Sequence, residues 1–215
     1  MLVALCSGGS DSIVMVHHIM QERKPPLVLN INYGQRNFKE AIYAQRCAER
    51  LGLSYRQITI TGAFTERALI QPELPLYHFT SNGVLLGNST MVANRNAVFA
   101  NIAAAVAIDA GAVGISMAIH KGDHDTYSDC TPEFIAALRV LVQQATDTRL
   151  EIYAPFVDIP KVQIIKLGKR LNVPFTDTWS CYDGEAVHCG LCSACQGRRN
   201  AFISAQVEDN TIYKQ

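Results

Sequence analysis

The chain of 215 residues is 48% hydrophobic and 18% charged, a composition typical of a globular protein rather than a disordered one. Its apolar runs fall short of the roughly 18 residues of a membrane span, and a polar stretch follows residue 6 too early for a secretory signal, so we expect a cytoplasmic location and no membrane partner. Nineteen basic residues offset nineteen acidic ones, which argues against a nucleic-acid partner because phosphate contacts need an excess of Lys and Arg.

The N-terminal third of the chain alternates short apolar runs with segments of helical periodicity. Apolar residues at Ile13, Val14, Val16 and Met20 have helical spacing, and Gly52 stands where a helix commonly ends. We therefore expect strands over 2–6, 27–31 and 55–60, with one helix between the first two strands and a second helix over 38–51.

Residues 61–93 lose this periodicity and contain Pro72 and Pro75. So long a loop in a compact domain is usually a lid, a binding loop or an oligomer contact, and the last of these would suit the homodimer that we expect. The alternation of strands and helices then resumes after residue 93. Its last helix is expected to begin at Pro160, because Pro is favoured at the first helical position. The remaining predicted elements are a helix over 96–109, a strand over 113–118, a helix after Pro132, a strand around Ile152 and a helix from Pro160.

Strands and helices that alternate through short turns predict an α/β fold. We expect a doubly wound, mostly parallel, Rossmann-like sheet with helices on both faces. The α/β domain is predicted over 1–178, and a small C-terminal region over 179–215 contains four of the seven cysteines.

Residues 7–12, Ser-Gly-Gly-Ser-Asp-Ser, form the first strand-to-helix turn, which is the usual phosphate site of such a sheet. Gly8 and Gly9 allow successive backbone amides to face one point, and the next helix adds its positive end, so we expect an anion there. The stretch lacks both the Lys of a Walker loop and the third Gly of a dinucleotide fingerprint. A plainer alternative is that Ser10 or Asp11 only caps the helix.

The C-terminal cysteines have the number and closeness of zinc ligands, since a closed structural zinc site takes four thiolates. His188 is a reserve ligand, and reduced structural cysteines or an iron–sulfur cluster are the alternatives. Arg198 and Arg199 either compensate the thiolate charge or are solvated. The predicted metal ligands are Cys181, Cys189, Cys192 and Cys195.

The opening loop resembles the SGGxDS signature of the PP-loop ATP pyrophosphatases, and further stretches narrow the resemblance to the QueC family of 7-cyano-7-deazaguanine synthases. The match extends from the first strand to about Phe202 and includes the four cysteines. The other matching stretches are Asn32–Arg36, Asn94–Asn96, His120–His124, Tyr127, Asp129–Cys130, Pro132–Phe134, Ala154–Phe156, Lys161 and Trp179–Cys181.

This resemblance implies an ATP-dependent C–N ligase with an adenine nucleotide alpha hydrolase-like fold. ATP would adenylate 7-carboxy-7-deazaguanine, ammonia would displace AMP to give an amide, and a second ATP would drive dehydration of the amide to the nitrile. AMP and pyrophosphate would be released, and Mg²⁺ would accompany the phosphates.

The resemblance also assigns residues to these roles. The ATP-binding residues would be Leu5, Cys6, Ser7, Gly8, Gly9, Ser10, Asp11 and Ser12. The catalytic residues would be Asp11, Lys161, Arg95, His120, Asp123 and His124, and the substrate-binding residues Tyr33, Gln35, Arg95, Asn96 and Asp129. The open alternatives are a surface salt bridge for Lys161 and Arg95, a strand-end cap for the histidines and simple packing for Tyr33.

Three positions depart from the family pattern, because Ala93, Ser128 and Thr131 stand where the family suggests Pro, Pro and Arg. The missing guanidinium leaves a second hypothesis open: a QueC-like paralogue that adenylates the same acid and joins it, as an amide, to ammonia or to another amine, such as one on a protein. A PP-loop tRNA-modifying enzyme and a catalytically silent nucleotide-binding module are further alternatives.

Overall fold

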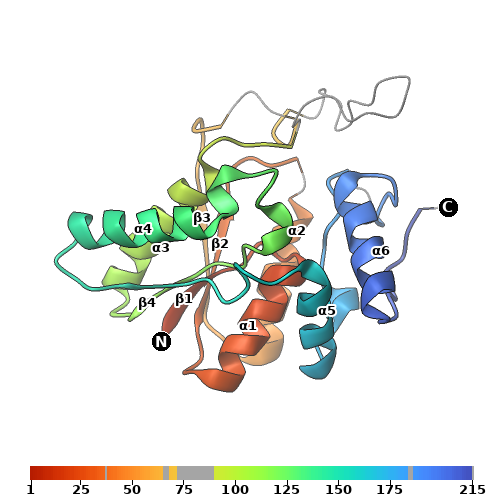
Figure 1. Cartoon of the computed structure of the whole chain (residues 1–215), viewed down its shortest axis with the longest axis horizontal. Coiled ribbons are helices and arrows are strands. Elements are labelled where there is room, and N and C mark those ends of the chain that lie inside the picture. The colour runs from red at the N-terminus through yellow and green to blue at the C-terminus, as the bar shows by residue number, and fades with distance from the viewer. Residues whose placement is uncertain (37, 65–67, 72–89, 184–185, 215) are drawn as a thin grey trace.

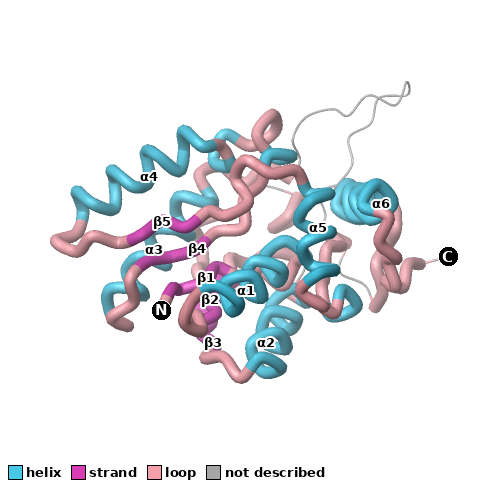
Figure 2. The backbone as a smooth tube through the Cα atoms, turned by 60° about the horizontal axis from the view of Figure 1, so that its bottom comes forward, coloured by secondary structure: helices cyan, strands magenta, loops and turns pink. Residues whose placement is uncertain are grey.

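The computed structural model describes residues 1–36, 38–64, 68–71, 90–183 and 186–214. Figure 1 shows the whole chain, with helices packed around a central sheet. Within the described residues, five strands form this parallel sheet in the order β3-β2-β1-β4-β5, and Figure 2 labels all five. The strands are β1 (Leu2–Leu5), β2 (Leu27–Asn32), β3 (Tyr55–Thr59), β4 (Gly114–Ser116) and β5 (Glu151–Tyr153).

Helices follow the strands as the sequence predicts, so the doubly wound α/β fold is confirmed. The strand predicted over 113–118 is shorter, because only three of its residues pair with both neighbouring strands. The helices are α1 (Ser10–Glu22), α2 (Lys39–Leu51), α3 (Arg95–Asp109), α4 (Pro132–Ala145), α5 (Lys161–Arg170) and α6 (Ser193–Ala205), with 3-10 turns η1 (Lys121–Asp123), η2 (Ser128–Cys130) and η3 (Phe175–Asp177).

The sheet separates two hydrophobic layers, because successive strand residues point to opposite faces. Leu2 and Ala4 face the layer of α1, α2 and α5, whereas Val3 faces the layer of α3 and α4. Helix α6 lies outside α5, away from the sheet (Figure 2). Its buried Phe202 belongs to the same core cluster as Leu2.

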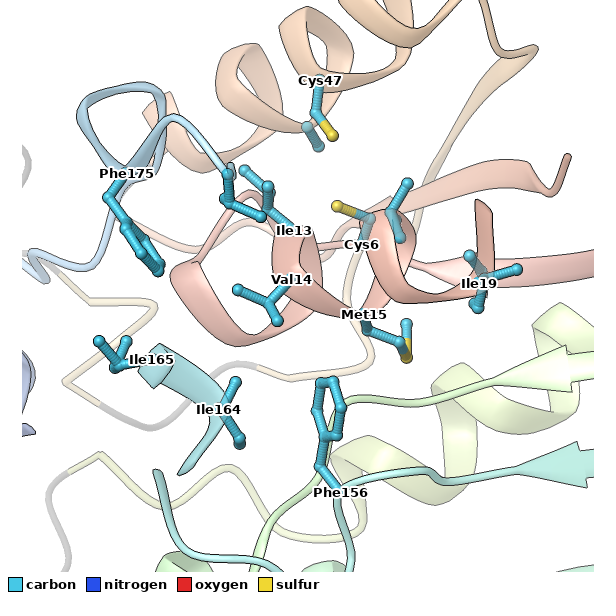
Figure 3. Packing of buried hydrophobic residues seen from close by; sticks show 14 of the residues in the cluster. Cys6, Ile13, Val14, Met15, Ile19, Cys47, Phe156, Ile164, Ile165 and Phe175 are labelled. Carbon is cyan, nitrogen blue, oxygen red and sulfur yellow. The ribbon is translucent and has the colours of Figure 1, made fainter. Parts of the chain in front are cut away.

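Helices α1 and α5 approach each other closely within the first layer. Val14 of α1 faces Ile164 of α5, and Met15 lies beside Phe156 (Figure 3). Gly168 of α5 permits this approach, since a Cβ there would lie 2.7 Å from Cγ2 of Val14. The packing holds the first residue of α5, Lys161, next to the start of α1.

The carboxyl ends of β1 and β4 lie at the point where the strand order reverses. The chain continues from β1 into α1 on one face, and it enters β4 from α3 on the other face. In open α/β sheets such a point leaves a crevice where ligands bind. None of the described helices combines the length and the apolar composition that a membrane crossing requires.

The segment 61–93, predicted as a lid, binding loop or oligomer contact, lies partly outside the described residues. Parts of the segment that are described lie near the crevice: Ala68 and Leu69 belong to one hydrophobic cluster with Tyr33, and Thr90 shares a hydrogen bond of 2.9 Å with the Tyr127 hydroxyl.

Candidate active site

A cavity of about 660 Å³ opens at the carboxyl ends of β1, β2 and β4. Its walls come from the turn after β1, the segment after β2, the start of α3, the segment after β4, the first residue of α5 and the stretch that precedes the cysteines. A polar half surrounds the start of α1, and a second half is lined by aromatic side chains.

The turn after β1 is shaped for an anion. Gly8 has a φ of 97°, and its N–H donates to Ser12 Oγ at 3.3 Å, while the N–H of Gly9 donates to Ser7 Oγ at 3.2 Å. Gly9 is the N-cap residue of α1 and no side chain caps the helix, so the alternative of Ser10 or Asp11 as the cap is wrong. The first amides of α1 therefore remain available to a ligand.

Two backbone contacts fix this turn to distant parts of the chain. The N–H of Trp179 donates to the Gly8 carbonyl at 2.9 Å. A Cβ on Gly8 would lie 2.0 Å from the carbonyl oxygen of Glu40, so glycine alone allows α2 to approach so closely.

Asp11, Lys161, His120 and Asp123 form one charged cluster at the start of α1. Lys161 Nζ lies 2.8 Å from Asp11 Oδ2, and His120 Nε2 lies 3.8 Å from Asp11 Oδ2 and 3.5 Å from Asp123 Oδ2. Burial alone would raise the pKa of Asp11, but Lys161 and His120 outweigh it and hold the pKa below its ordinary value. The pKa of Asp123 is raised, chiefly by burial.

The tautomer of His120 follows from its backbone contact. Its Nδ1 accepts a hydrogen bond from the N–H of Gly122 at 3.1 Å, so the proton of the neutral ring is on Nε2, which faces the two carboxylates. His124 is placed differently: it is not among the cavity-lining residues, and its Nε2 is buried with no partner in the described structure.

The aromatic half of the cavity contains the other cation predicted from the sequence. Arg95 donates to the Tyr33 hydroxyl at 3.3 Å, and the Tyr33 ring packs against Phe99 with centroids 5.3 Å apart. Gln35 also lines the cavity, and its Oε1 accepts from the N–H of Tyr33 at 2.9 Å.

Asn96 lines the cavity too, and it joins α3 to Asp129. The N–H of Asn96 donates to Asp129 Oδ2 at 3.0 Å, so the Asp129 carboxylate binds the first turn of α3. Asp129 is not among the cavity-lining residues.

The four predicted metal ligands come together as the spacing indicated. Their sulfur atoms lie within 4.8 Å of one another, and all four residues are buried. Backbone amides point at the sulfurs, among them Cys189 N and Asp183 N, each 3.3 Å from Cys181 Sγ. Hydrogen bonds from Cys192 and Cys195 lower the pKa of Cys181. Buried sulfurs that converge and accept N–H donors could hold a metal ion such as zinc.

His188 and Arg198, which the sequence suggested as a reserve metal ligand and as a counter-charge for the thiolates, make other contacts in the structure. His188 Nε2 accepts from the N–H of Ser180 at 3.2 Å and is not one of the converging ligands. Arg198 is fully buried, pairs with Asp209 at 3.2 Å and donates to Thr178 Oγ1 at 2.7 Å. Neither compensation of the thiolates nor solvation describes Arg198, because Asp209 supplies its counter-charge.

The family model of the queuosine biosynthesis protein QueC matches residues 1–206. The chain belongs to the QueC family. The 7-cyano-7-deazaguanine synthase of Rhizobium meliloti (strain 1021) is 39% identical over 217 residues, which cover 98% of this chain and 91% of that protein. The enzyme of the same name from Rhizobium rhizogenes is 39% identical over 218 residues, covering 99% and 91%.

A structural comparison agrees with the fold. The NMN synthetase from Francisella tularensis aligns with a TM-score of 0.50 and 15% identity, over 97% of this chain and 78% of that one. This similarity concerns the fold alone. Membership of the QueC family confirms the resemblance found in the sequence, and the relatives are named as synthases, which confirms the expectation of an enzyme.

The departures from the QueC pattern have local explanations in part. Thr131, which stands where the family suggests Arg, caps α4: its Oγ1 accepts from the N–H of Phe134 at 3.1 Å. Ser128 begins η2. Nothing in the structure explains Ala93.

Glu40 and Tyr182 are cavity-lining residues that the sequence analysis missed. Burial raises the pKa of Glu40 to about 7. A signal for Glu40 was present, since it follows the strand predicted over 27–31 and lies in the first turn of the next helix. Tyr182 carried no such signal, because only the folding of the cysteine region brings it to the cavity.

Proposed function

We propose that this protein converts 7-carboxy-7-deazaguanine to 7-cyano-7-deazaguanine in two ATP-dependent stages. In the first stage ATP adenylates the carboxylate and ammonia displaces AMP to give an amide. In the second stage another ATP activates the amide for dehydration to the nitrile. The observation that carries this proposal is one cavity that joins an anion-binding turn to an aromatic, Arg-containing pocket in a chain of the QueC family.

The polar half of the cavity suits the triphosphate of ATP. The free amides of α1 and the hydroxyls of Ser7, Ser10 and Ser12 would hold the departing pyrophosphate. Lys161 would neutralise charge on the α-phosphate. This role is supported by its Nζ, which lies 2.8 Å from Oδ2 of Asp11 in the first turn of α1. Such fixed charges act mainly by positioning and by stabilising charge in the transition state.

The charged cluster also fits Mg²⁺. Asp11 Oδ1 is buried without a hydrogen-bond partner, and Asp123 lines the same part of the cavity. Carboxylate oxygens are the protein ligands that Mg²⁺ prefers. We assign these two carboxylates to the ion, which would neutralise phosphate charge.

The metal of the four-cysteine cluster is proposed to be structural zinc. All four ligand positions would be filled by thiolates, which leaves no open position for a substrate. The two domains, the lid, the homodimer and the cytoplasmic location expected from the sequence stay predictions.

The product of the reaction tests the proposal. The protein is incubated with 7-carboxy-7-deazaguanine, ATP, Mg²⁺ and ammonium, and the product is followed by mass spectrometry together with AMP and pyrophosphate. We expect the nitrile and two AMP for each acid consumed. Formation of ADP and phosphate in place of AMP and pyrophosphate would refute the proposal.

A second candidate is a QueC-like paralogue that stops at an amide with ammonia or another amine. The observation that favours it is Thr131, which caps α4 where the family suggests a guanidinium. An amide that accumulates with one AMP for each acid, and does not proceed to nitrile, would select this candidate.

A further inference from the structure

Glu40 is a cavity carboxylate to which the proposed reaction gives no task. It lies in the first turn of α2 and lines the cavity. In the described part of the chain its carboxylate takes part in no hydrogen bond and no ion pair, whereas Asp11 is paired with Lys161 and Asp123 with His120. Among the described lining residues, Glu40 is therefore the one whose carboxylate has neither oxygen in a hydrogen bond or an ion pair.

The surroundings of Glu40 are those of a pocket for a flat, polar ring. Arg95, Tyr33 and Tyr182 interact electrostatically with Glu40 and line the same cavity. The Tyr33 ring packs edge-on against Phe64 and lies 5.3 Å from Phe99. The pocket thus combines aromatic side chains, a cation that donates and a carboxyl group that, once ionised, only accepts hydrogen bonds.

The proposed substrate has the complementary pattern. One side of 7-carboxy-7-deazaguanine carries the acceptors, which are the 6-oxo group and the 7-carboxylate. The opposite edge carries two adjacent donors, N1–H and the 2-amino group. A guanidinium suits the first side, and a carboxylate that accepts two parallel N–H bonds suits the second.

We propose that Glu40 accepts hydrogen bonds from N1–H and the 2-amino group of the deazaguanine and so selects a guanine-type ring. This assignment rests on the proposed function, because it names the residue that recognises that substrate. The raised pKa of Glu40 agrees with a carboxyl group that meets no donor until the substrate arrives.

The test compares Glu40→Gln with the wild type and with Glu49→Gln, a control at the exposed side of the same helix. KM is measured for the acid, for ATP and for ammonium by pyrophosphate release, and the acid is replaced in parallel by its analogue without the 2-amino group. We expect Glu40→Gln to raise the KM of the acid by about 10- to 150-fold, the value of hydrogen bonds to a charged group. The KM values of ATP and ammonium should remain within about twofold.

The analogue isolates the contact from any effect on folding. The wild type and Glu49→Gln should prefer the acid to the analogue by roughly tenfold or more, and Glu40→Gln should lose most of that preference. Glu40→Asp keeps the carboxylate and should retain part of it. Equal use of acid and analogue by the wild type would overturn the inference, even if Glu40→Gln failed to fold.

Two other results would assign Glu40 to a different task. A raised KM for ATP or ammonium, with that of the acid unchanged, would place it at the adenine or at the amine. A fall in kcat alone would make it a group that acts on the reacting atoms. If the wild type released no pyrophosphate with the acid, the proposed function would fail, whereas acid-dependent turnover without selectivity would defeat only the assignment of Glu40.

Discussion

Substitution of Gly8 by Ala should damage the anion-binding turn through two separate costs. Gly8 has a φ of 97°, where a residue with a Cβ is strained by about 1–2 kcal/mol. The new Cβ would also lie 2.0 Å from the Glu40 carbonyl oxygen and 3.0 Å from Ala44 N, and both are backbone atoms that cannot rotate away. Overpacking of this kind costs about 1–3 kcal/mol.

Together these costs predict that Gly8→Ala lowers the free energy of unfolding by about 2–5 kcal/mol. Relief of the overlap requires the turn and α2 to separate by about 1 Å, and a displacement of that size at a reactive site reduces turnover by about 100-fold. Urea denaturation followed by circular dichroism measures the first effect, and acid-dependent pyrophosphate release measures the second.

Alanine substitutions at two other glycines distinguish the cost of backbone strain from the cost of the Cβ overlap. Gly52 has a φ of 65° and open space around it, so Gly52→Ala should show the strain alone, about 1 kcal/mol. Gly9 has a φ of −72° and its nearest new contact would be the Ser7 hydroxyl at 3.3 Å, so Gly9→Ala should stay within about 1 kcal/mol of the wild type in stability. A Gly8→Ala protein as stable as Gly52→Ala, with wild-type turnover, would refute the reasoning.

Three further predictions concern the charged groups and the cysteines. Lys161→Met should raise the pKa of Asp11 and lower pyrophosphate release by about 100- to 1,000-fold. The control Lys166→Met, on the exposed side of α5, should change neither quantity. Equal rates of pyrophosphate release in the two variants would contradict the role of Lys161. Cys181→Ser should lose the bound metal and several kcal/mol of stability, as measured by elemental analysis and thermal unfolding, while Cys47→Ala keeps the metal; full metal content in Cys181→Ser would speak against the four-thiolate site. Arg198→Met should cost about 3–5 kcal/mol because it leaves the Asp209 carboxylate without its cationic partner, far more than Arg199→Met. The pKa of Asp209 in the folded protein lies below its ordinary 3.8, so the stability that the Arg198–Asp209 pair contributes is present above pH 3.8 and is lost as the pH falls through the folded-state pKa. Urea titrations should therefore show the stabilities of the wild type and Arg198→Met converging in acid.

Much of the fold was predictable because local signals agreed with the tertiary structure. The alternation of apolar runs with helical spacing predicted the sheet, and the Gly8–Gly9 pair correctly predicted a turn between β1 and α1 that lines the cavity. The four cysteines converge as their spacing indicated, since residues three apart in a short turn present side chains to one side.

The sequence was less informative where a role depends on a contact between distant segments. Arg198 looked like a counter-ion of the thiolates because it follows them closely, but folding brings Asp209 to it instead. Asp129 and His124 lie within family motifs, yet neither is among the cavity-lining residues, and Asp129 instead accepts from the Asn96 amide in the first turn of α3. The sequence did not single out Glu40, because the reason to consider it is that its carboxylate makes no hydrogen bond or ion pair with the other described residues. Only the three-dimensional structure shows such a property.

The hydrogen bond between Trp179 and Gly8 would couple metal binding at the four-cysteine cluster to the shape of the turn after β1. Trp179 precedes Cys181, the first of the four clustered cysteines, by two residues, and its N–H donates to the carbonyl of Gly8 in the turn after β1. A newly made chain without a bound ion would hold Trp179 less firmly and would therefore support the turn after β1 less well. A limited metal supply would then lower the fraction of active molecules, whereas the turnover number of each active molecule would stay the same.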